Sequence, residues 1–197
     1  PTSAGELFAV NYDGKKNKLI FGYRAKGGLP VSAHGGFLLD NLEGDDKHIL
    51  IKKRELTRSG GAKPRAVKLN VYTGRENRVK RAPIAYGGFL VDHTGTPRFA
   101  NGTDEDHVTH VYYTEGKGKD WQKFAGEIKG EFYPLGFAED NNTVYVAKSN
   151  NGEPKGLYEY DIATKKSTLV YQSQLVSPTT LNVDLNQVYG VRIDEDY

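Results

Sequence analysis

Two hairpin units that alternate along the chain constrain its fold more than any other feature. In the first unit, an alternating strand meets a short polar turn, and an apolar residue returns twelve positions after the first one. Three copies span 7–19, 67–79 and 157–169, and a weaker copy spans 111–124. Alternation on both sides of a polar turn is typical of a β-hairpin.

The second unit holds an apolar strand, an acidic turn and another strand. Its four turns carry Asp40, Asp92, Asp140 and Asp184, which are separated by 52, 48 and 44 residues. Two hairpins per period make four strands, and four-stranded units recurring every ~40–50 residues are the signature of a β-propeller. A sandwich or an up-and-down barrel would explain the strands but not this long period. The pattern therefore predicts an all-β propeller segment of four-stranded antiparallel blades.

The repeat assigns the whole chain, 1–197, to this propeller segment. We expect about three full blades, at 31–82, 84–125 and 131–172, and two half-blades, at 1–25 and 178–197. Closed propellers have about four to eight blades, so the simplest interpretation is a fragment of a larger propeller. The start at Pro1 without an initiator Met favours the same interpretation. An alternative pairs the two half-blades into a composite fourth blade. Uncovered blade edges predict self-association.

Composition agrees with an all-β chain and removes several function classes. The chain has 13 Tyr and 23 Gly, which favour strands and turns over helices. Its 27 basic and 25 acidic residues leave a net charge of +2, so we expect neither nucleic acid nor a membrane as partner. The absence of Cys excludes disulfides and thiolate nucleophiles, and leaves the compartment, cytoplasmic or periplasmic, open.

Two glycine pairs precede apolar strands in successive blades. The first follows His34, as Gly35-Gly36-Phe37, and is similar to the His-Gly-Gly stretch that forms an oxyanion hole in lipases and esterases. The second follows Tyr86, as Gly87-Gly88-Phe89, in the equivalent place. Because the histidine is not repeated, we expect both pairs to admit close backbone packing as a strand begins.

The stretch from Asp92 to Thr96 is similar to the phosphorylated Asp-Lys-Thr-Gly-Thr motif of the P-type ion pumps. His93 stands where that motif has lysine. The stretch also lies at the turn that the repeat matches to Asp40 and Asp140. We therefore expect Asp92 to cap its own hairpin.

Four potential metal ligands lie within seven residues: Asp104, Asp106, His107 and His110. Carboxylate and imidazole groups at such spacing can hold a divalent ion, but polar loops on a propeller face have the same composition. The chain has no G-x-S-x-G, no phosphate-binding loop and no H-E-x-x-H. We therefore assign no catalytic, cofactor-binding or metal-binding residue, and whether the Asp104–His110 cluster binds a metal stays open.

Several hairpins resemble those of a known family. The stretches 157–170 and 68–74 resemble degenerate blades of bacterial prolyl oligopeptidase-family serine peptidases, of the dipeptidyl aminopeptidase and acylaminoacyl peptidase type. The succession from 87–95 to 111–113 is similar to the N-terminal β-propeller domain of those proteins. Tol-type periplasmic propellers and sugar-processing propellers use similar hairpins.

The resemblance implies a function. In that family the propeller precedes an α/β-hydrolase domain, which bears the catalytic triad, and covers its active site. This chain would then be a non-catalytic domain that gates and selects peptide substrates for a C-terminal hydrolase domain of the same parent chain. The alternative is a stand-alone ligand- or protein-binding propeller of the Tol-type or sugar-processing kind. A third hypothesis makes the chain an enzyme through the Asp104–His110 cluster.

Overall fold

Every regular element that the structure describes is a β-strand. The computed structural model describes residues 5–22, 24–25, 34–55, 61–124, 132–149, 153–175, 178–184 and 187–193, and gives side chains in the last two ranges only for 190–192. No helix in this part of the chain is long and apolar enough to cross a membrane. The expectation of an all-β chain is therefore confirmed.

The strands form three four-stranded antiparallel sheets and two hairpins. The first sheet is β3 (His34–Asp40), β4 (His48–Glu55), β5 (Arg65–Asn70) and β6 (Glu76–Arg81). The second is β7 (Gly88–Val91), β8 (Pro97–Thr103), β9 (Thr109–Tyr113) and β10 (Gln122–Lys123). The third is β11 (Phe132–Phe137), β12 (Thr143–Lys148), β13 (Gly156–Asp161) and β14 (Ser167–Tyr171). The hairpins are β1 (Leu7–Ala9) with β2 (Lys18–Phe21), and β15 (Pro178–Asp184) with β16 (Gln187–Ile193).

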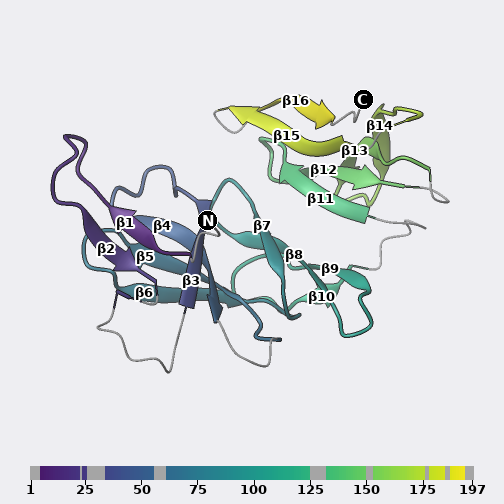
Figure 1. Cartoon of the computed structure of the whole chain (residues 1–197). Helices are drawn as coiled ribbons and strands as arrows, with labels where there is room; N and C mark the ends of the chain where they lie inside the picture. Colours follow the sequence, from purple (N-terminus) through teal and green to yellow (C-terminus); the bar gives the residue numbers. More distant parts are fainter. Residues whose placement is uncertain are drawn as a thin grey trace.

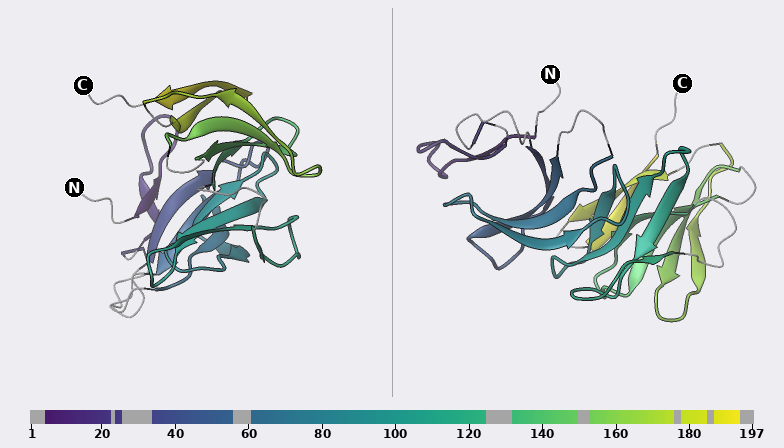
Figure 2. Two further views of the ribbon diagram at one scale, coloured as in Figure 1. Left: turned by 90° about the vertical axis from the view of Figure 1, so that its right-hand side faces the viewer. Right: turned by 90° about the horizontal axis from the view of Figure 1, so that it is seen from below.

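The first strand of each sheet lies beside the first strand of the next. β3 contacts β7, β7 contacts β11, and β11 contacts β15. The first strands of successive sheets therefore lie together on the inner side of the molecule, while the outer strands diverge. This is the arrangement of blades in a propeller (Figures 1 and 2). The two hairpins form separate two-stranded sheets, so the described strands build no composite fourth blade.

The core lies between the faces of neighbouring sheets. Within β4, the adjacent residues Leu50 and Ile51 are both 0% exposed, although they point to opposite faces. Ile51 packs with Ile20 and Phe21 from β2, whereas Leu50 packs in another cluster with Leu42. The first sheet is therefore covered on both faces, by the first hairpin and by the second sheet.

The second and third sheets share the largest apolar cluster. It joins Phe99 of β8 and Val111 of β9 to Phe137, Val144 and other residues of the third sheet. The rings of Phe99 and Phe137 lie 5.9 Å apart between their centroids. Burying each such side chain stabilises the fold by about 1.5–3 kcal/mol. This contact sets the distance between the two sheets whose outer parts line the cleft described below.

The acidic turns of successive blades contact one another. Asp40 accepts a hydrogen bond from the N–H of Leu42 at 2.6 Å, and Leu42 packs against Gly95 of the next blade. A Cβ on Gly95 would lie 2.3 Å from Leu42, and its φ is +75°, so only glycine fits there. One blade further, the N–H of His93 donates to Asn141 Oδ1 at 2.8 Å. The side chain of Asp184, at the fourth turn, lies outside the described residues.

Candidate functional site

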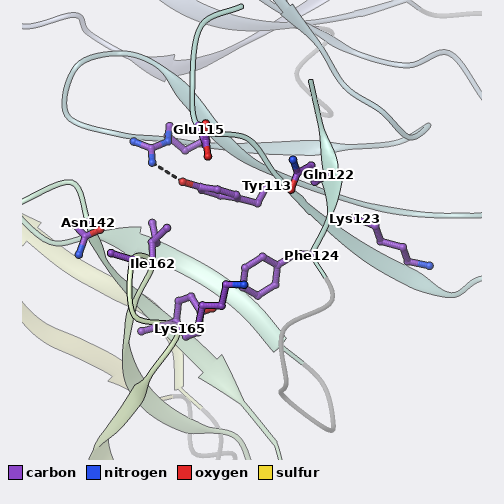
Figure 3. A pocket seen from close by; sticks show the side chains of 11 residues that line it. Tyr113, Glu115, Gln122, Lys123, Phe124, Asn142, Ile162 and Lys165 are labelled. Carbon is purple, nitrogen blue, oxygen red and sulfur yellow. Dashed lines mark hydrogen bonds between the residues drawn. The ribbon is translucent and has the colours of Figure 1, made fainter. Parts of the chain in front are cut away.

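A cleft of about 770 Å³ lies between the second and third sheets. One wall belongs to the second sheet and the other to the ends of β12 and β13 with the turn that follows (Figure 3). The lining residues are Arg98, Tyr113, Glu115, Gln122, Lys123 and Phe124 on the first wall, and Asn142, Tyr160, Ile162, Ala163 and Lys165 on the second.

Aromatic rings from both walls meet at the base of the cleft. Phe124 packs edge to face against Tyr160, with 5.5 Å between ring centroids, and against Tyr113, with 6.4 Å. Tyr113 rests in turn on the fully buried Phe99, 5.0 Å away. The base is therefore a rigid apolar surface on which a flat or apolar group can pack.

Arg98 is held firmly at one side of this base. Its guanidinium donates to Asp92 Oδ2 at 3.2 Å, to the Tyr113 hydroxyl at 2.7 Å and to the carbonyl of Thr114 at 3.1 Å. Burial disfavours its charge, but the hydrogen bonds to Tyr113 and Asp92 outweigh burial and raise the pKa of Arg98. Its charge is thus fixed in place and already paired with Asp92.

The loop that carries Glu115 is fastened by Lys80 of β6. The Lys80 ammonium donates to Thr114 Oγ1 at 3.2 Å, to the carbonyl of Gly116 at 3.1 Å and to the carbonyl of Lys119. It also lies 4.9 Å from the centroid of the Trp121 ring. Partial burial lowers the pKa of Lys80. Lys80 therefore occupies the place that a bound cation would take in such a ring of oxygens.

The turn from Asp161 to Lys166 forms the opposite lip. Asp161 accepts hydrogen bonds from the N–H of Thr164 at 2.6 Å and from its hydroxyl at 2.8 Å, and the first of these bonds contributes most to lowering the pKa of Asp161. Lys165 has a φ of 59°. The Asp161 N–H donates to the carbonyl of Lys166 and so closes this turn. In the β5–β6 turn the Asn70 N–H donates to the carbonyl of Arg75 in the same way, and Gly74 has the left-handed conformation there. Lys165 therefore stands where glycine is the least strained residue.

The two glycine pairs serve close packing. The N–H of Gly36 donates to the carbonyl of Gly5 at 2.7 Å, and a Cβ on Gly36 would lie 2.6 Å from the Phe21 ring. In the next blade, a Cβ on Gly87 would lie 3.2 Å from the carbonyl oxygen of Asn101. Because the Gly36 N–H already has an acceptor, it is not available to an oxyanion.

Asp92 lies in the β7–β8 turn, and it is only 3% exposed. Its Oδ1 accepts hydrogen bonds from the N–H groups of Thr94 and Thr96, both at 3.0 Å, while Oδ2 pairs with Arg98. The carboxylate thus holds its own turn and orients the arginine of the cleft. Its burial leaves no approach for a phosphoryl donor.

The Asp104–His110 cluster forms the tip of the β8–β9 hairpin. Asp104 Oδ1 accepts from the N–H of Asp106 at 3.0 Å and of Val108 at 2.8 Å, and Oδ2 lies 2.6 Å from His110 Nε2. The hydrogen bond to His110 is the main reason that the pKa of Asp104 is lowered. The structure pairs Asp104 with His110, and no group of three or more such ligands gathers among the described residues.

The cleft was not predicted from the sequence, because the residues that line it belong to no contiguous motif. Arg98 and Lys165, for example, are far apart in the sequence and belong to different sheets. One signal in the sequence was usable: the weakest copy of the hairpin unit, 111–124, is the one that supplies Tyr113 and Phe124 to the cleft. The lining offers cations, one carboxylate, amides and aromatic rings.

Comparisons with known proteins support the fold. No protein-family model and no curated protein matches the chain. Among solved structures, TolB from Acinetobacter baumannii matches 89% of this chain at 14% identity with a TM-score of 0.54. The WD40 domain of SCAP from fission yeast matches 97% of it at 14% identity with a TM-score of 0.45. The chain spans about 40% of the TolB chain and 44% of the WD40 chain. The likeness to TolB shows the β-propeller fold and nothing more specific.

Proposed function

We propose that this propeller segment is a non-catalytic binding module, and that the cleft between its second and third sheets holds an extended peptide segment of a partner protein. The observation that carries the proposal is the cleft itself, a hollow of about 770 Å³ with an aromatic base and polar walls. Ligand sites in proteins have volumes of about 300–1,000 Å³ and combine apolar surface with a few polar groups.

The outer edge of β10 favours a peptide over a compact small molecule. Among the described strands, β10 pairs only with β9, so one edge of Gln122 and Lys123 is unpaired. Both residues also line the cleft. An extended peptide can add to such an edge through backbone hydrogen bonds while its side chains enter the neighbouring hollow. The amides of Gln122 and Asn142 offer further hydrogen bonds to it.

A cleft-filling variant tests the proposal. Ala163 is an exposed residue of the lip, and Ala163→Trp would place a large ring in the cleft without changing charge. The matched control is Tyr72→Trp, at the same position of the β5–β6 turn, where no cleft residue lies. We expect a random-peptide display library to yield sequences that bind the wild type and Tyr72→Trp, and that lose at least about tenfold in affinity for Ala163→Trp.

Fluorescence anisotropy with the selected peptides measures these affinities. Thermal unfolding of both variants checks that neither substitution has disturbed the blade. A library that yields no binding sequence, or sequences whose affinity does not change with Ala163→Trp, would refute the cleft as a peptide site.

The hairpins that resemble prolyl oligopeptidase-family blades suggest a second setting for the same module. These hairpins form β13–β14 and β5–β6, and the first of them carries one lip of the cleft. In this setting the cleft would select peptides for a C-terminal α/β-hydrolase domain. Sequencing the gene downstream of Tyr197 tests this setting. The gating role requires a G-x-S-x-G motif there, followed by Asp and then His in the same reading frame. Further blades alone would instead support a stand-alone binding propeller.

A further inference from the structure

We infer that the cleft selects acidic peptides, and that the Lys165 ammonium provides this selectivity. The inference deepens the proposed function and rests on it. Four of the lining residues are charged: Arg98, Lys123 and Lys165 are cations, and Glu115 is the one carboxylate. The whole chain, in contrast, is nearly balanced with 27 basic and 25 acidic residues. The positive excess is therefore a local property of the cleft.

The three cations are not equally available to a ligand, and Figure 3 shows the Lys123 side chain extending away from the other labelled side chains. Arg98 already forms an ion pair with Asp92 and donates to Tyr113, so much of its charge is neutralised. Lys165 has no hydrogen-bond or ion-pair partner among the residues that the structure describes. Figure 3 shows its side chain extending from the β13–β14 turn toward Phe124 at the base of the cleft. A carboxylate entering the cleft would meet the Lys165 ammonium beside an aromatic ring.

The backbone at Lys165 adds an independent observation. A left-handed conformation is strained for a residue other than glycine, and the equivalent turn avoids this strain by using Gly74. The chain therefore holds a lysine side chain at the lip of the cleft although glycine would suit the turn better.

The chemistry of the expected peptide follows from these neighbours. Side chains of an extended peptide alternate, so residues i and i+2 point to the same face. Because Lys165 lines the same cleft as the rings of Phe124 and Tyr160, the complementary pair is Asp or Glu at one position and an aromatic or large aliphatic residue two positions away.

Three fluorescein-labelled octapeptide pools test this selectivity. In each pool Phe, Tyr or Leu is followed two positions later by a second residue type, with Gly or Ser at the remaining positions. The second type is Asp or Glu in the acidic pool, Asn or Gln in the neutral pool, and Lys in the basic pool. We expect the acidic pool to bind the wild-type chain at least about fivefold more tightly than the neutral pool at 0.05 M NaCl, and the basic pool most weakly. The difference should shrink at about 0.5 M NaCl, where the Debye length is only ~4 Å.

Lys165→Gly removes the ammonium without straining the backbone, because this position already has the left-handed conformation that glycine adopts readily. Lys16→Gly is the matched control: it removes the same charge from a left-handed residue of the β1–β2 turn, outside the cleft. We expect Lys165→Gly to erase the preference for the acidic pool, and Lys16→Gly to retain it. Thermal unfolding should show that neither variant is less stable than the wild type.

Each outcome separates this inference from the proposed function. Equal binding of the acidic and neutral pools, with binding still lost in Ala163→Trp, would overturn acidic selectivity and leave the peptide site standing. A preference for the acidic pool that survives Lys165→Gly would overturn the role of Lys165. If no pool binds the wild type although a peptide selected from the random library does, only this inference fails; if neither binds, both proposals fail.

Discussion

At the scale of single residues, two basic side chains, Lys80 of the first sheet and Lys165 of the third, have opposite roles. Lys80 is surrounded by oxygen atoms of the 114–119 loop and covered by Trp121, so its charge is used inside the molecule. Lys165 is strained and unpaired among the described residues, so its charge faces outward. Charge alone would not have separated the two, because each is one lysine among 27 basic residues.

Replacing Lys80 tests its structural role. Lys80→Met keeps most of the side-chain length but removes the ammonium that bonds the Thr114 hydroxyl and two carbonyls. We expect the free energy of unfolding to fall by about 1–3 kcal/mol, because these acceptors lose a charged donor. Lys117→Met, an exposed change in the same loop, should alter it by less than about 0.5 kcal/mol.

Urea denaturation gives the two free energies, and the single Trp provides a local reading of the same change. Trp121 emission should shift in Lys80→Met, because the ammonium over its ring is lost, and stay unchanged in Lys117→Met. Equal stability of both variants would show that the loop does not depend on Lys80.

At the scale of the elements, the turns share one device: an acidic or amide side chain accepts hydrogen bonds from the backbone that follows it. Asp45, Asp104, Asp140 and Asp161 all hold their turns in this way. The donors lower the pKa of each carboxyl, with His48 and His110 as the main cause for Asp45 and Asp104. For Asp140, burial opposes the effect, but the bonds from Thr143 and Asn142 outweigh it.

These turns predict a loss of stability in acid. Each carboxyl has a folded pKa below its ordinary value of 3.8, so the folded state binds fewer protons than the unfolded state. The stabilisation is complete above pH 3.8 and is lost as the pH falls through the lower folded pKa. We expect the urea midpoint to drop steeply below about pH 4.

A variant that cannot titrate provides the control. Asp161→Asn keeps an oxygen that can accept the Thr164 N–H but removes the carboxyl that binds a proton. It should be less stable than the wild type at pH 6 and should approach the wild type at pH 2. A constant difference between the two proteins over this range would contradict the role assigned to the turn carboxyls.

At the scale of the whole molecule, the sheets are stabilised by contact with neighbouring blades, and β14 lacks such cover. Leu169, Val170 and Tyr171 of this strand are 51%, 50% and 40% exposed. β14 is also the outer strand of its sheet, and no described strand pairs with its outer edge. An apolar strand with a free edge favours association with another chain.

The exposed strand β14 therefore predicts that the chain associates with itself. We expect sedimentation velocity to show a concentration-dependent increase in the mean sedimentation coefficient. The double variant Leu169→Glu, Tyr171→Glu, which places a charge on each face of β14 on either side of its register shift, should reduce the increase. Thr168→Glu, which replaces a residue of the same strand that is already polar, should have a smaller effect. A wild-type chain that stays monomeric at all concentrations would refute the prediction.

The repeat was sufficient to predict the strands, the four-stranded sheets and the turns, because alternation and turn chemistry are local properties. Asp92 illustrates this: its position in the repeat already indicated a turn residue, and the structure places it in the β7–β8 turn. The sequence did not decide the structure of the 104–110 stretch, because its residues suit both a metal site and a polar loop. The 104–110 stretch had the composition of a metal site, but the structure pairs Asp104 with His110 at a hairpin tip.

The cleft lay beyond the reach of the sequence. Phe124 and Tyr160 meet because two sheets pack through Phe99 and Phe137, and the space above them depends on side-chain volumes from both sheets at once. No pattern along the chain encodes such a distance. The two alternating hairpin units therefore specify each blade, whereas the packing of one blade on the next creates the surface to which we assign the function.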